Sequence, residues 1–378
     1  MKLLWAISNW KHTGPVQPSL DLARAVADQG PDVLVEVGRP PSGDLAEAGA
    51  MREDRGLPAA GVGARLCKHA FFLRDRPDRR LLRRWIARER PDACVATLPN
   101  DHRLLLASAG DVPVVRLWFS DGESEPAPRE REALLRTPLV YVFGDRPRDR
   151  LRALGLPQGR IRVLGPPLDV EATRARATDV AGARRLLGVG EDEFLFGIVA
   201  RLQTHRRYEM LWEALGLLKA TGAPHRLVVL GRGTYEEEVG RRPVRELGLE
   251  DHVVFGGYLK GEAYASAVAA FDAQLLLVPG SDPTCRALRE GMALGVPGIA
   301  TRRGLLPSMV VDGETGLLTD ETAEALADTL ARMARDREGA RVMGEAARRF
   351  ANAHFDTRVV ATSFLRDLPI REPGRRTR

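Results

Sequence analysis

The chain has 378 residues, 44% hydrophobic and 29% charged, which suits a globular protein with two domains of roughly 150–200 residues each. A net charge of +6 permits anionic partners, but the basic residues are almost all Arg and charge alone selects none of those partners. No apolar run approaches the ~20 residues that span a bilayer, and the N-terminal run MKLLWAISNW suits a buried strand better than a signal peptide. The three Cys lack metal-ligand spacing. We therefore expect a cytoplasmic protein.

Short β-type runs alternate with helical patterns along the chain, which predicts parallel sheets built from βαβ units. The strands predicted in the first half are Leu3–Ile7, Val33–Val37, Ala93–Thr97, Val112–Leu117, Leu139–Val142 and Ile161–Leu164, with helices over Ser19–Gln29 and Arg79–Arg88. The strands predicted in the second half are Phe194–Val199, Arg226–Leu230, Val253–Phe255, Ala273–Val278 and Gly298–Ala300. The helices predicted there are Tyr208–Thr221, Tyr235–Leu247, Glu262–Ala270, Thr284–Leu294 and Ala323–Ala334.

The seam between the two halves is expected near Pro166-Pro167, because a Pro pair stops regular structure. We therefore predict an N-terminal domain over 1–168 and a C-terminal domain over 169–356. The segment 357–370 is expected to pack back on the N-terminal domain, and the tail 371–378, rich in Arg, is expected to be disordered.

The segment from Val278 to Gly316 combines a strand end, a Pro-containing loop and a helix start. Asp282 stands at the entrance of that helix and Glu290 about two turns inside it. Open α/β sheets bind ligands at such strand ends, where backbone N–H groups favour phosphate. The acids would repel phosphate but suit the hydroxyls of a sugar (Asp282) and of a ribose (Glu290). On spacing alone, a helix cap and a solvated acid explain the two residues equally well.

A second group of residues follows the buried strand Phe194–Val199. Arg201, Arg206 and Arg207 lie in the loop that enters the next helix. Guanidinium groups beside a helix N-terminus can clamp phosphate, because each presents a planar fork of donors. A solvated basic turn would explain the same residues in so Arg-rich a chain.

Together these segments resemble the retaining GT-B glycosyltransferases of family 4, the glycosyl transferases group 1, and the resemblance runs through most of the second half. The family's strand–Gly-Arg-Leu–Lys pattern corresponds to Val199-Ala200-Arg201-Leu202, with Arg206 in place of Lys. The other corresponding runs are Gly231-Arg232-Gly233, Val253 through Tyr258, Asp282 through Glu290 (the E-x7-E motif), Gly291 through Pro297, Asp312 through Gly316, and the inter-domain run Gly165 through Asp169.

The resemblance implies an α/β, GT-B fold in which two Rossmann-like domains face each other across a donor-binding cleft. It implies a bacterial, metal-independent enzyme without cofactor that transfers a hexosyl or N-acetylhexosaminyl group with retention of configuration. The donor would be a nucleotide-diphosphate sugar of the UDP or GDP type. The resemblance implies that the C-terminal domain binds this donor and the N-terminal domain holds the acceptor. The acceptor would be a glycan, a lipid-linked molecule or a small molecule.

The family's site residues carry over to positions of this sequence. Arg201 and Arg206 would hold the donor diphosphate and, together with Asp282, carry catalysis, while Asp282 meets the sugar and Glu290 the ribose. The remaining donor-binding positions are Gly14 in a loop opposite the phosphates, Tyr258 beside the base, and Thr284 and Cys285.

Some residues depart from the family pattern. Thr284-Cys285 replaces the usual Phe-Gly, the first acid is Asp in place of Glu, and the first half has no His in register, although His102 and Asp121 are near. A catalytically weak or non-catalytic sugar-nucleotide-binding protein is therefore the alternative, and a nucleotide-sugar 2-epimerase is a second one on the same fold. No nucleic-acid-binding motif is present.

The stretch 71–90 is strongly basic, and Leu81, Leu82, Trp85 and Ile86 fall on one helical stripe. Such a helix could lie on an anionic membrane surface. The favoured interpretation is a solvated basic helix whose apolar stripe packs on the sheet of the N-terminal domain.

Overall fold

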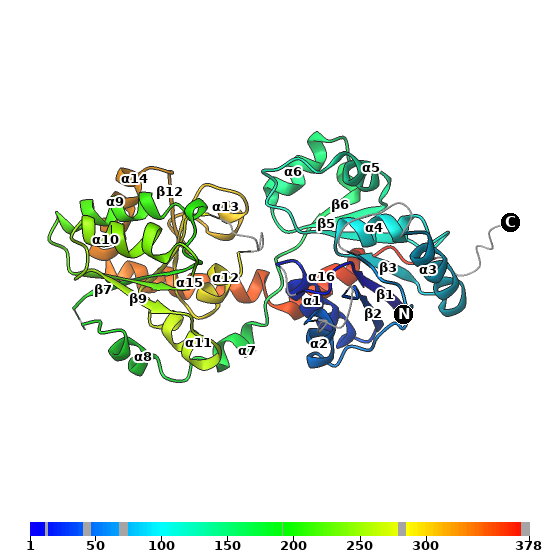
Figure 1. The fold of residues 1–378 in the computed structure, drawn as a ribbon, viewed down its shortest axis with the longest axis horizontal. Helices are drawn as coiled ribbons and strands as arrows, with labels where there is room; N and C mark the ends of the chain where they lie inside the picture. The colour runs from blue at the N-terminus through cyan, green and yellow to red at the C-terminus, as the bar shows by residue number, and fades with distance from the viewer. Residues whose placement is uncertain (12–13, 41–46, 68–74, 191, 279–284, 372–378) are drawn as a thin grey trace. The chain divides into compact units, whose positions relative to one another are not determined.

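The computed structural model describes residues 1–11, 14–40, 47–67, 75–190, 192–278 and 285–371. The chain divides into two compact units (Figure 1). Unit 1 contains Met1–Pro167 and the segment that begins at Asp356. Unit 2 contains the described residues from Leu168 to Phe355.

Unit 1 is built on a six-stranded parallel sheet with the order β2-β1-β3-β4-β5-β6. The chain adds β2 on one side of β1 and then continues with β3 on its other side, so the topological switch point lies between β1 and β3. Both faces of the sheet are covered, and the inner strands β3, β4 and β5 are accordingly buried along their whole length. The strands are β1 (Lys2–Ile7), β2 (Asp32–Val37), β3 (Ala93–Ala96), β4 (Val114–Trp118), β5 (Leu139–Val142) and β6 (Ile161–Val163).

Helices on the two faces of this sheet complete unit 1 (Figure 1). They are α1 (Val16–Ala27), α2 (Glu47–Asp54), α3 (Asp75–Glu89), α4 (Pro99–Leu106), α5 (Pro128–Arg136), α6 (Asp145–Ala153) and α16 (Thr357–Asp367), with a short 3₁₀ turn η1 (Gln158–Arg160). The last of them, α16, follows unit 2 in the chain but packs in unit 1. Phe364 of α16 is fully buried, its ring centre lies 5.6 Å from that of Trp5, and its carbonyl accepts a 2.8 Å hydrogen bond from the Tyr141 hydroxyl.

Unit 2 repeats the design with a six-stranded parallel sheet of order β12-β11-β10-β7-β8-β9. Its switch point lies between β7 and β10, because β8 and β9 extend the sheet on one side of β7 and β10 to β12 on the other. The strands are β7 (Phe194–Val199), β8 (His225–Leu230), β9 (Val253–Gly257), β10 (Ala273–Leu276), β11 (Gly298–Thr301) and β12 (Gly316–Thr319).

The helices of unit 2 also cover both faces of its sheet (Figure 1). They are α7 (Val170–Ala175), α8 (Val180–Leu186), η2 (Thr204–Arg206), α9 (Tyr208–Lys219), the π-helical η3 (Glu237–Arg241), α10 (Arg242–Glu246), α11 (Gly261–Ala269), α12 (Arg286–Ala293), α13 (Leu306–Met309), α14 (Ala323–Arg335) and α15 (Arg337–His354). A large core of apolar residues joins β7, β8 and β10 to α9 and α14. The helices leave the carboxyl edge of the sheet to the loops that follow the strands.

The first and the last residue of unit 2 are neighbours in space. The first residue of unit 2, Leu168, donates its backbone N–H to the carbonyl of the last one, Phe355, at 2.7 Å. Unit 2 is therefore an insertion into unit 1, and the two ends of that insertion meet.

The structure corrects details of the predicted elements. The helix predicted over Tyr235–Leu247 is divided into η3 and α10, because Pro243 has no N–H to continue a regular ladder. Strand β12 and the long helix α15 were not predicted.

The basic stretch 71–90 forms α3 from Asp75 onward, and residues before it lie outside the described ranges. Leu82, Trp85 and Ile86 are buried in the core of unit 1, and Leu81 packs against it. A membrane-inserting helix would need that stripe exposed, so the favoured interpretation, packing within the domain, is correct.

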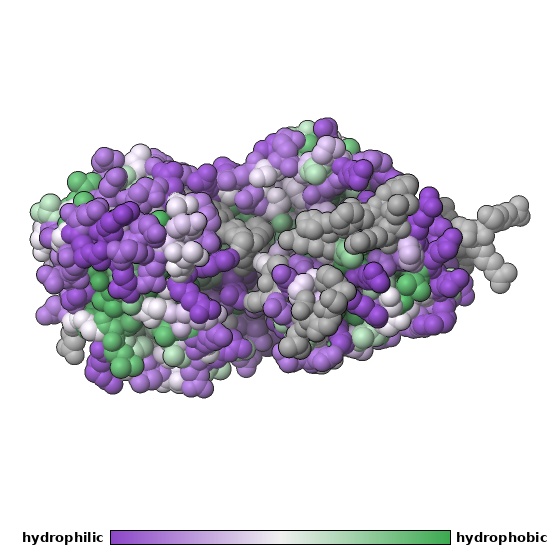
Figure 2. Space-filling view, viewed as in Figure 1, coloured by the Kyte–Doolittle hydropathy of each residue, from purple (hydrophilic) through white to green (hydrophobic). Residues whose placement is uncertain are grey.

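Polar residues cover most of the visible face of the described chain in Figure 2, and apolar residues gather there only in small areas. None of the helices in the described ranges has the length and apolar content needed to cross a bilayer.

Candidate functional site

The carboxyl edge of the unit 2 sheet gathers most of the residues that the sequence singled out. Arg201 and Arg206 follow β7, Tyr258 follows β9, and Cys285 and Glu290 follow β10. Since parallel strands end at the same edge and β7 and β10 flank the switch point, this is where an open α/β sheet binds ligands.

The loop after β7 is held against the sheet by buried anchors. Leu202 is 1% exposed, and the hydroxyl of the buried Tyr208 donates to the carbonyl of Ala200 at 3.2 Å. Between these anchors the chain makes the single turn η2, and Arg207, with φ +61°, turns it into α9. The loop thereby leaves Arg201 exposed and Arg206 half-buried.

Arg206 connects the two strands at the switch point. One of its terminal N–H groups donates to the carbonyl of Val278, two residues after the end of β10, at 3.2 Å. Its Nε is buried and has no hydrogen-bond partner among the described residues. Burial lowers the pKa of Arg206, and the charge of Arg201 lowers it further, yet an Arg side chain stays protonated in proteins. The site thus holds a desolvated cation with an unused donor, which suits an anion.

The glycine turn after β8 packs directly under the loop after β7. A Cβ on Gly231 would lie 2.1 Å from the carbonyl oxygen of Ala200, and one on Gly233 would lie 2.0 Å from that of Leu202. Only glycine allows this approach of two backbones. The turn also carries Arg232, whose guanidinium carbon lies 4.7 Å from the centre of the Tyr258 ring, a cation–π distance. Tyr258 itself is 55% exposed at the end of β9.

Helix α12 carries Glu290, the acidic residue of the site, in its second turn. Cys285 occupies the N-cap position of this helix with φ +51°, and it is buried, which places the thiol inside the fold. The hydroxyl of Tyr264 donates to Glu290 Oε2 at 2.6 Å, and Arg286 lies 3.8 Å from Oε1. Burial raises the pKa of Tyr264 and the charge of Glu290 raises it further, so the phenol remains a donor. Glu290 is therefore held as an oriented acceptor.

The other predicted site residues are placed differently. Asp282 and Thr284 lie outside the described residues. Gly14 belongs to unit 1, where it directly precedes Pro15 at the start of α1. His102, which lay near the position of the missing histidine, is fully buried in α4 and its Nε2 shares a 2.7 Å hydrogen bond with Thr137, so it is a packing residue.

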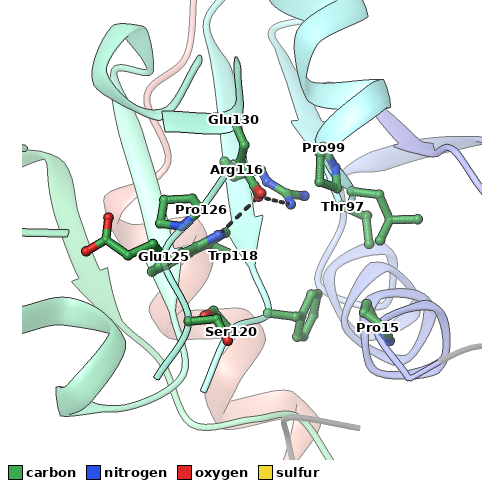
Figure 3. Close-up of a pocket in the computed structure, with 12 residues that line it drawn as sticks. Pro15, Thr97, Pro99, Arg116, Trp118, Ser120, Glu125, Pro126 and Glu130 are labelled. Carbon is green, nitrogen blue, oxygen red and sulfur yellow. Dashed lines mark hydrogen bonds and ion pairs between the residues drawn. The ribbon is translucent and has the colours of Figure 1, made fainter. Parts of the chain in front are cut away.

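Sequence reasoning missed a cavity of about 230 Å³ in unit 1 (Figure 3). It lies at the carboxyl ends of β3 and β4, and Arg116 and Glu130 line it. Arg116 is 2% exposed and its terminal nitrogen lies 3.4 Å from Glu130 Oε1. The sequence did carry a signal, since a charged residue within the buried strand VVRLW is rare unless it is paired or functional.

Comparisons with known proteins show a family match and related sequences. Residues 183–350 match the family described as glycosyl transferases group 1. The chain is 31% identical over 283 residues to a D-inositol 3-phosphate glycosyltransferase of Saccharomonospora viridis, covering 71% of this chain and 62% of that protein. It is 28% identical over 226 residues to a GDP-mannose-dependent alpha-(1-6)-phosphatidylinositol monomannoside mannosyltransferase of Mycobacterium tuberculosis, covering 58% of each. The chain spans about half to three fifths of the length of the curated relatives that it matches.

The chain is also similar to a solved structure along nearly its whole length. HepE of Anabaena, crystallised with UDP, matches with a TM-score of 0.78 and 19% identity, covering 97% of this chain and 99% of that one. At this identity the similarity concerns the fold alone. Together with the two parallel six-stranded sheets, it confirms the predicted α/β, Rossmann-like GT-B fold.

Proposed function

We propose that the protein uses unit 2, which contains the match to the glycosyl transferases group 1, to transfer a sugar from a nucleotide-diphosphate sugar to an acceptor hydroxyl. The observation that carries the proposal is Arg206, a desolvated cation with an unused Nε donor at the switch point of the sheet. Arg201 stands exposed in the same loop and adds a second cation. A diphosphate fits two guanidinium groups, because each offers a planar fork of N–H donors.

In the proposed reaction, the bond between the anomeric carbon and the diphosphate oxygen breaks, and a bond to the acceptor oxygen forms on the same face of the sugar. The configuration is thereby retained. The acceptor proton passes to an oxygen of the departing diphosphate. Arg201 and Arg206 neutralise the negative charge that develops on that group, which is electrostatic stabilisation of the transition state.

The remaining assignments place the donor along the carboxyl edge. Glu290, oriented by Tyr264, accepts hydrogen bonds from the ribose diol, and the backbone at Tyr258 lies beside the base. Asp282 meets the hydroxyls of the sugar, and Gly14 lets the backbone of its loop approach the diphosphate. We propose a UDP- or GDP-sugar as donor, carrying a hexose or an N-acetylhexosamine, because relatives include a GDP-mannose-dependent enzyme and a structural neighbour was crystallised with UDP.

We further propose that transfer needs no metal ion, since the two guanidinium groups supply the positive charge at the diphosphate. Transfer is then expected to continue in excess EDTA. A complete loss of transfer that added Mg²⁺ restores would contradict this part of the proposal.

A cytoplasmic location and a peripheral membrane contact through α3 stay predictions. Because the apolar stripe of α3 is buried, such a contact would use its exposed arginines, which include Arg80, Arg83 and Arg84. It would then depend on charge alone and weaken as salt rises.

The proposal is tested first by binding and then by product formation. A ligand that binds only the folded protein raises its melting temperature. UDP-, GDP-, ADP- and dTDP-sugars are therefore screened by thermal shift, and the stabilising donor is incubated with candidate acceptors, with products detected by mass spectrometry. Stabilisation followed by a glycosylated product supports the transferase. Stabilisation without product or free nucleotide supports the non-catalytic alternative.

We expect Arg206→Ala to weaken binding of the donor by roughly 1.5–3 kcal/mol, about 10- to 150-fold, because a charge-assisted contact to phosphate is lost. Calorimetry with the nucleoside diphosphate measures the change. Arg185→Ala, an exposed position on α8, is the control with no expected effect. Equal affinity in Arg206→Ala and Arg185→Ala would refute the role of Arg206.

A further inference from the structure

The cavity of unit 1 contains a buried guanidinium with unused donors. Arg116 comes from the inner strand β4, and its Nε and one terminal nitrogen are buried without a hydrogen-bond partner among the described residues. The other terminal nitrogen lies 3.4 Å from Glu130 Oε1, a long contact. Buried donors without partners cost free energy, so these two nitrogens favour an acceptor that reaches them through the cavity.

Glu130 offers the complementary acceptor. Its Oε1 is shared between Arg116 and the indole N–H of Trp118, the latter at 3.2 Å. Both contacts are drawn in Figure 3, and they hold the carboxylate at the wall of the cavity on the first turn of α5. A fixed donor and a fixed acceptor thus stand side by side.

The charges around Arg116 argue against an anionic ligand. Besides Glu130, the buried Asp101 interacts with the guanidinium, and both carboxylates raise the pKa of Arg116 against the lowering effect of burial. Burial raises the pKa of Asp101 to about 6, but the backbone N–H groups of Ser8, Thr97 and Leu98 donate to its carboxylate and favour the ionised form. The charge of Arg116 is already balanced by these carboxylates, and a phosphate group would add negative charge beside them.

The walls of the cavity suit a small ring. Trp118 and Pro126 stand on one side, and Thr97 and Pro99 on the other (Figure 3). Rigid apolar faces of this kind pack against the C–H groups of a sugar or cyclic polyol. At about 230 Å³ the cavity is smaller than the roughly 300–1,000 Å³ of pockets for drug-sized ligands, which fits a single ring.

We infer that this cavity binds the acceptor as a neutral hydroxylated ring, with Arg116 donating to one hydroxyl oxygen of a vicinal diol and Glu130 accepting from its neighbour. The inference rests on the proposed function, because it assigns the ligand of the cavity as the acceptor of the transfer. It makes Arg116 and Glu130 the residues that select a neutral ring over a phosphorylated one.

The test uses methyl α-D-glucopyranoside and myo-inositol as neutral probes and inorganic phosphate as the anionic probe. Binding to the full chain is measured by saturation-transfer NMR, at constant ionic strength. Glu130→Gln removes the acceptor charge, and Ser124→Trp fills the cavity from an exposed lining position without touching a buried contact. Glu132→Gln, on the exposed face of the same helix α5, is the matched control.

We expect saturation transfer to at least one neutral probe in the wild type and in Glu132→Gln, and a loss of at least fivefold in Glu130→Gln and in Ser124→Trp. Should Glu130→Gln fail to fold, Ser124→Trp alone decides. Absence of transfer to both neutral probes, transfer that Ser124→Trp leaves unchanged, or displacement of the probes by equimolar phosphate would overturn the inference.

Nucleotide-sugar binding, measured on the same samples by thermal shift, separates this inference from the proposed function. If probe binding fails while a nucleotide sugar still stabilises the protein, only the cavity assignment falls. If probes bind as expected but no nucleotide sugar does, the cavity is a polyol site and the transferase proposal falls.

Discussion

Arg206 and Glu290 contribute to different parts of the proposed donor site, and a ligand without a ribose can separate their roles. Pyrophosphate carries the charge of a nucleoside diphosphate but no diol. Glu290→Gln is expected to weaken binding of the nucleoside diphosphate about 5- to 20-fold, as hydrogen bonds to a charged acceptor are lost, and to leave pyrophosphate binding unchanged. Arg206→Ala is expected to weaken both. Calorimetry with the two ligands measures this, and equal losses in Glu290→Gln for both ligands would show that Glu290 does not contact the ribose.

A buried histidine is expected to make unit 2 sensitive to acid. The Nδ1–H of His225 donates to the carbonyl of Ala223 at 2.7 Å, and its buried Nε2 has no hydrogen-bond partner among the described residues. Burial lowers the pKa of His225 below its ordinary value of 6.5, and the stacked His252 lowers it further. Below pH 6.5 the unfolded chain therefore binds more protons than the folded one, and stability falls as pH decreases from about 7.5 to 5.5.

This expectation is checked by the melting temperature at the two pH values. His225→Phe keeps a ring against His252 and should show a smaller fall than the wild type. His205→Gln, an exposed position, should show the same fall as the wild type. A fall that His225→Phe leaves unaltered would assign the acid sensitivity to other groups.

At the scale of elements, the glycine turn after β8 offers a matched pair of substitutions. In Gly233→Ala the new Cβ would lie 2.0 Å from the carbonyl of Leu202, so the loops after β7 and β8 must separate. We expect a loss of about 1–3 kcal/mol in stability and weaker nucleotide binding. Gly216→Ala, inside α9 with no atom near the new Cβ, is expected to stabilise by roughly 0.5–1 kcal/mol and to leave binding unchanged. Unchanged nucleotide affinity in Gly233→Ala would separate the turn from the site.

The sequence predicted most accurately the strands that have a clear apolar run between turn residues. The strands Phe194–Val199 and Leu139–Val142 form as predicted, because apolar runs bounded by turn residues admit few alternatives in a parallel sheet. Strand β12 escaped prediction since its four residues follow a turn without a long apolar run. Arg206 could be placed in the correct loop from its sequence neighbours alone.

Contacts between distant segments could not be read from the sequence. The pairing of Tyr264 with Glu290 joins residues on α11 and α12, and no local pattern connects them. The cavity around Arg116 likewise depends on how β3, β4 and α5 meet in unit 1.

At the scale of the whole molecule, α16 should stabilise unit 1 and leave the fold of unit 2, with Arg206 and Glu290, unchanged. Phe364 is fully buried against Trp5, so Phe364→Ala is expected to destabilise unit 1 by about 3–5 kcal/mol. Val359→Ala, 43% exposed on the same helix, is the control. Calorimetric scanning should show one of two transitions moving down, while the nucleotide sugar still raises the other. A shift of both transitions together would mean that the units unfold as one.

The hydrogen bond between Leu168 and Phe355, which joins the two ends of the insertion, has a consequence for folding during translation. Unit 2 is continuous in the chain, so it can fold as soon as Phe355 has emerged, whereas unit 1 must wait for α16. At about 5–20 residues per second, the roughly 190 residues of the insertion take about 10–40 s to translate. During that time Trp5 and Tyr141 lack their contacts with Phe364, so part of the apolar surface of unit 1 stays uncovered until α16 has been synthesised.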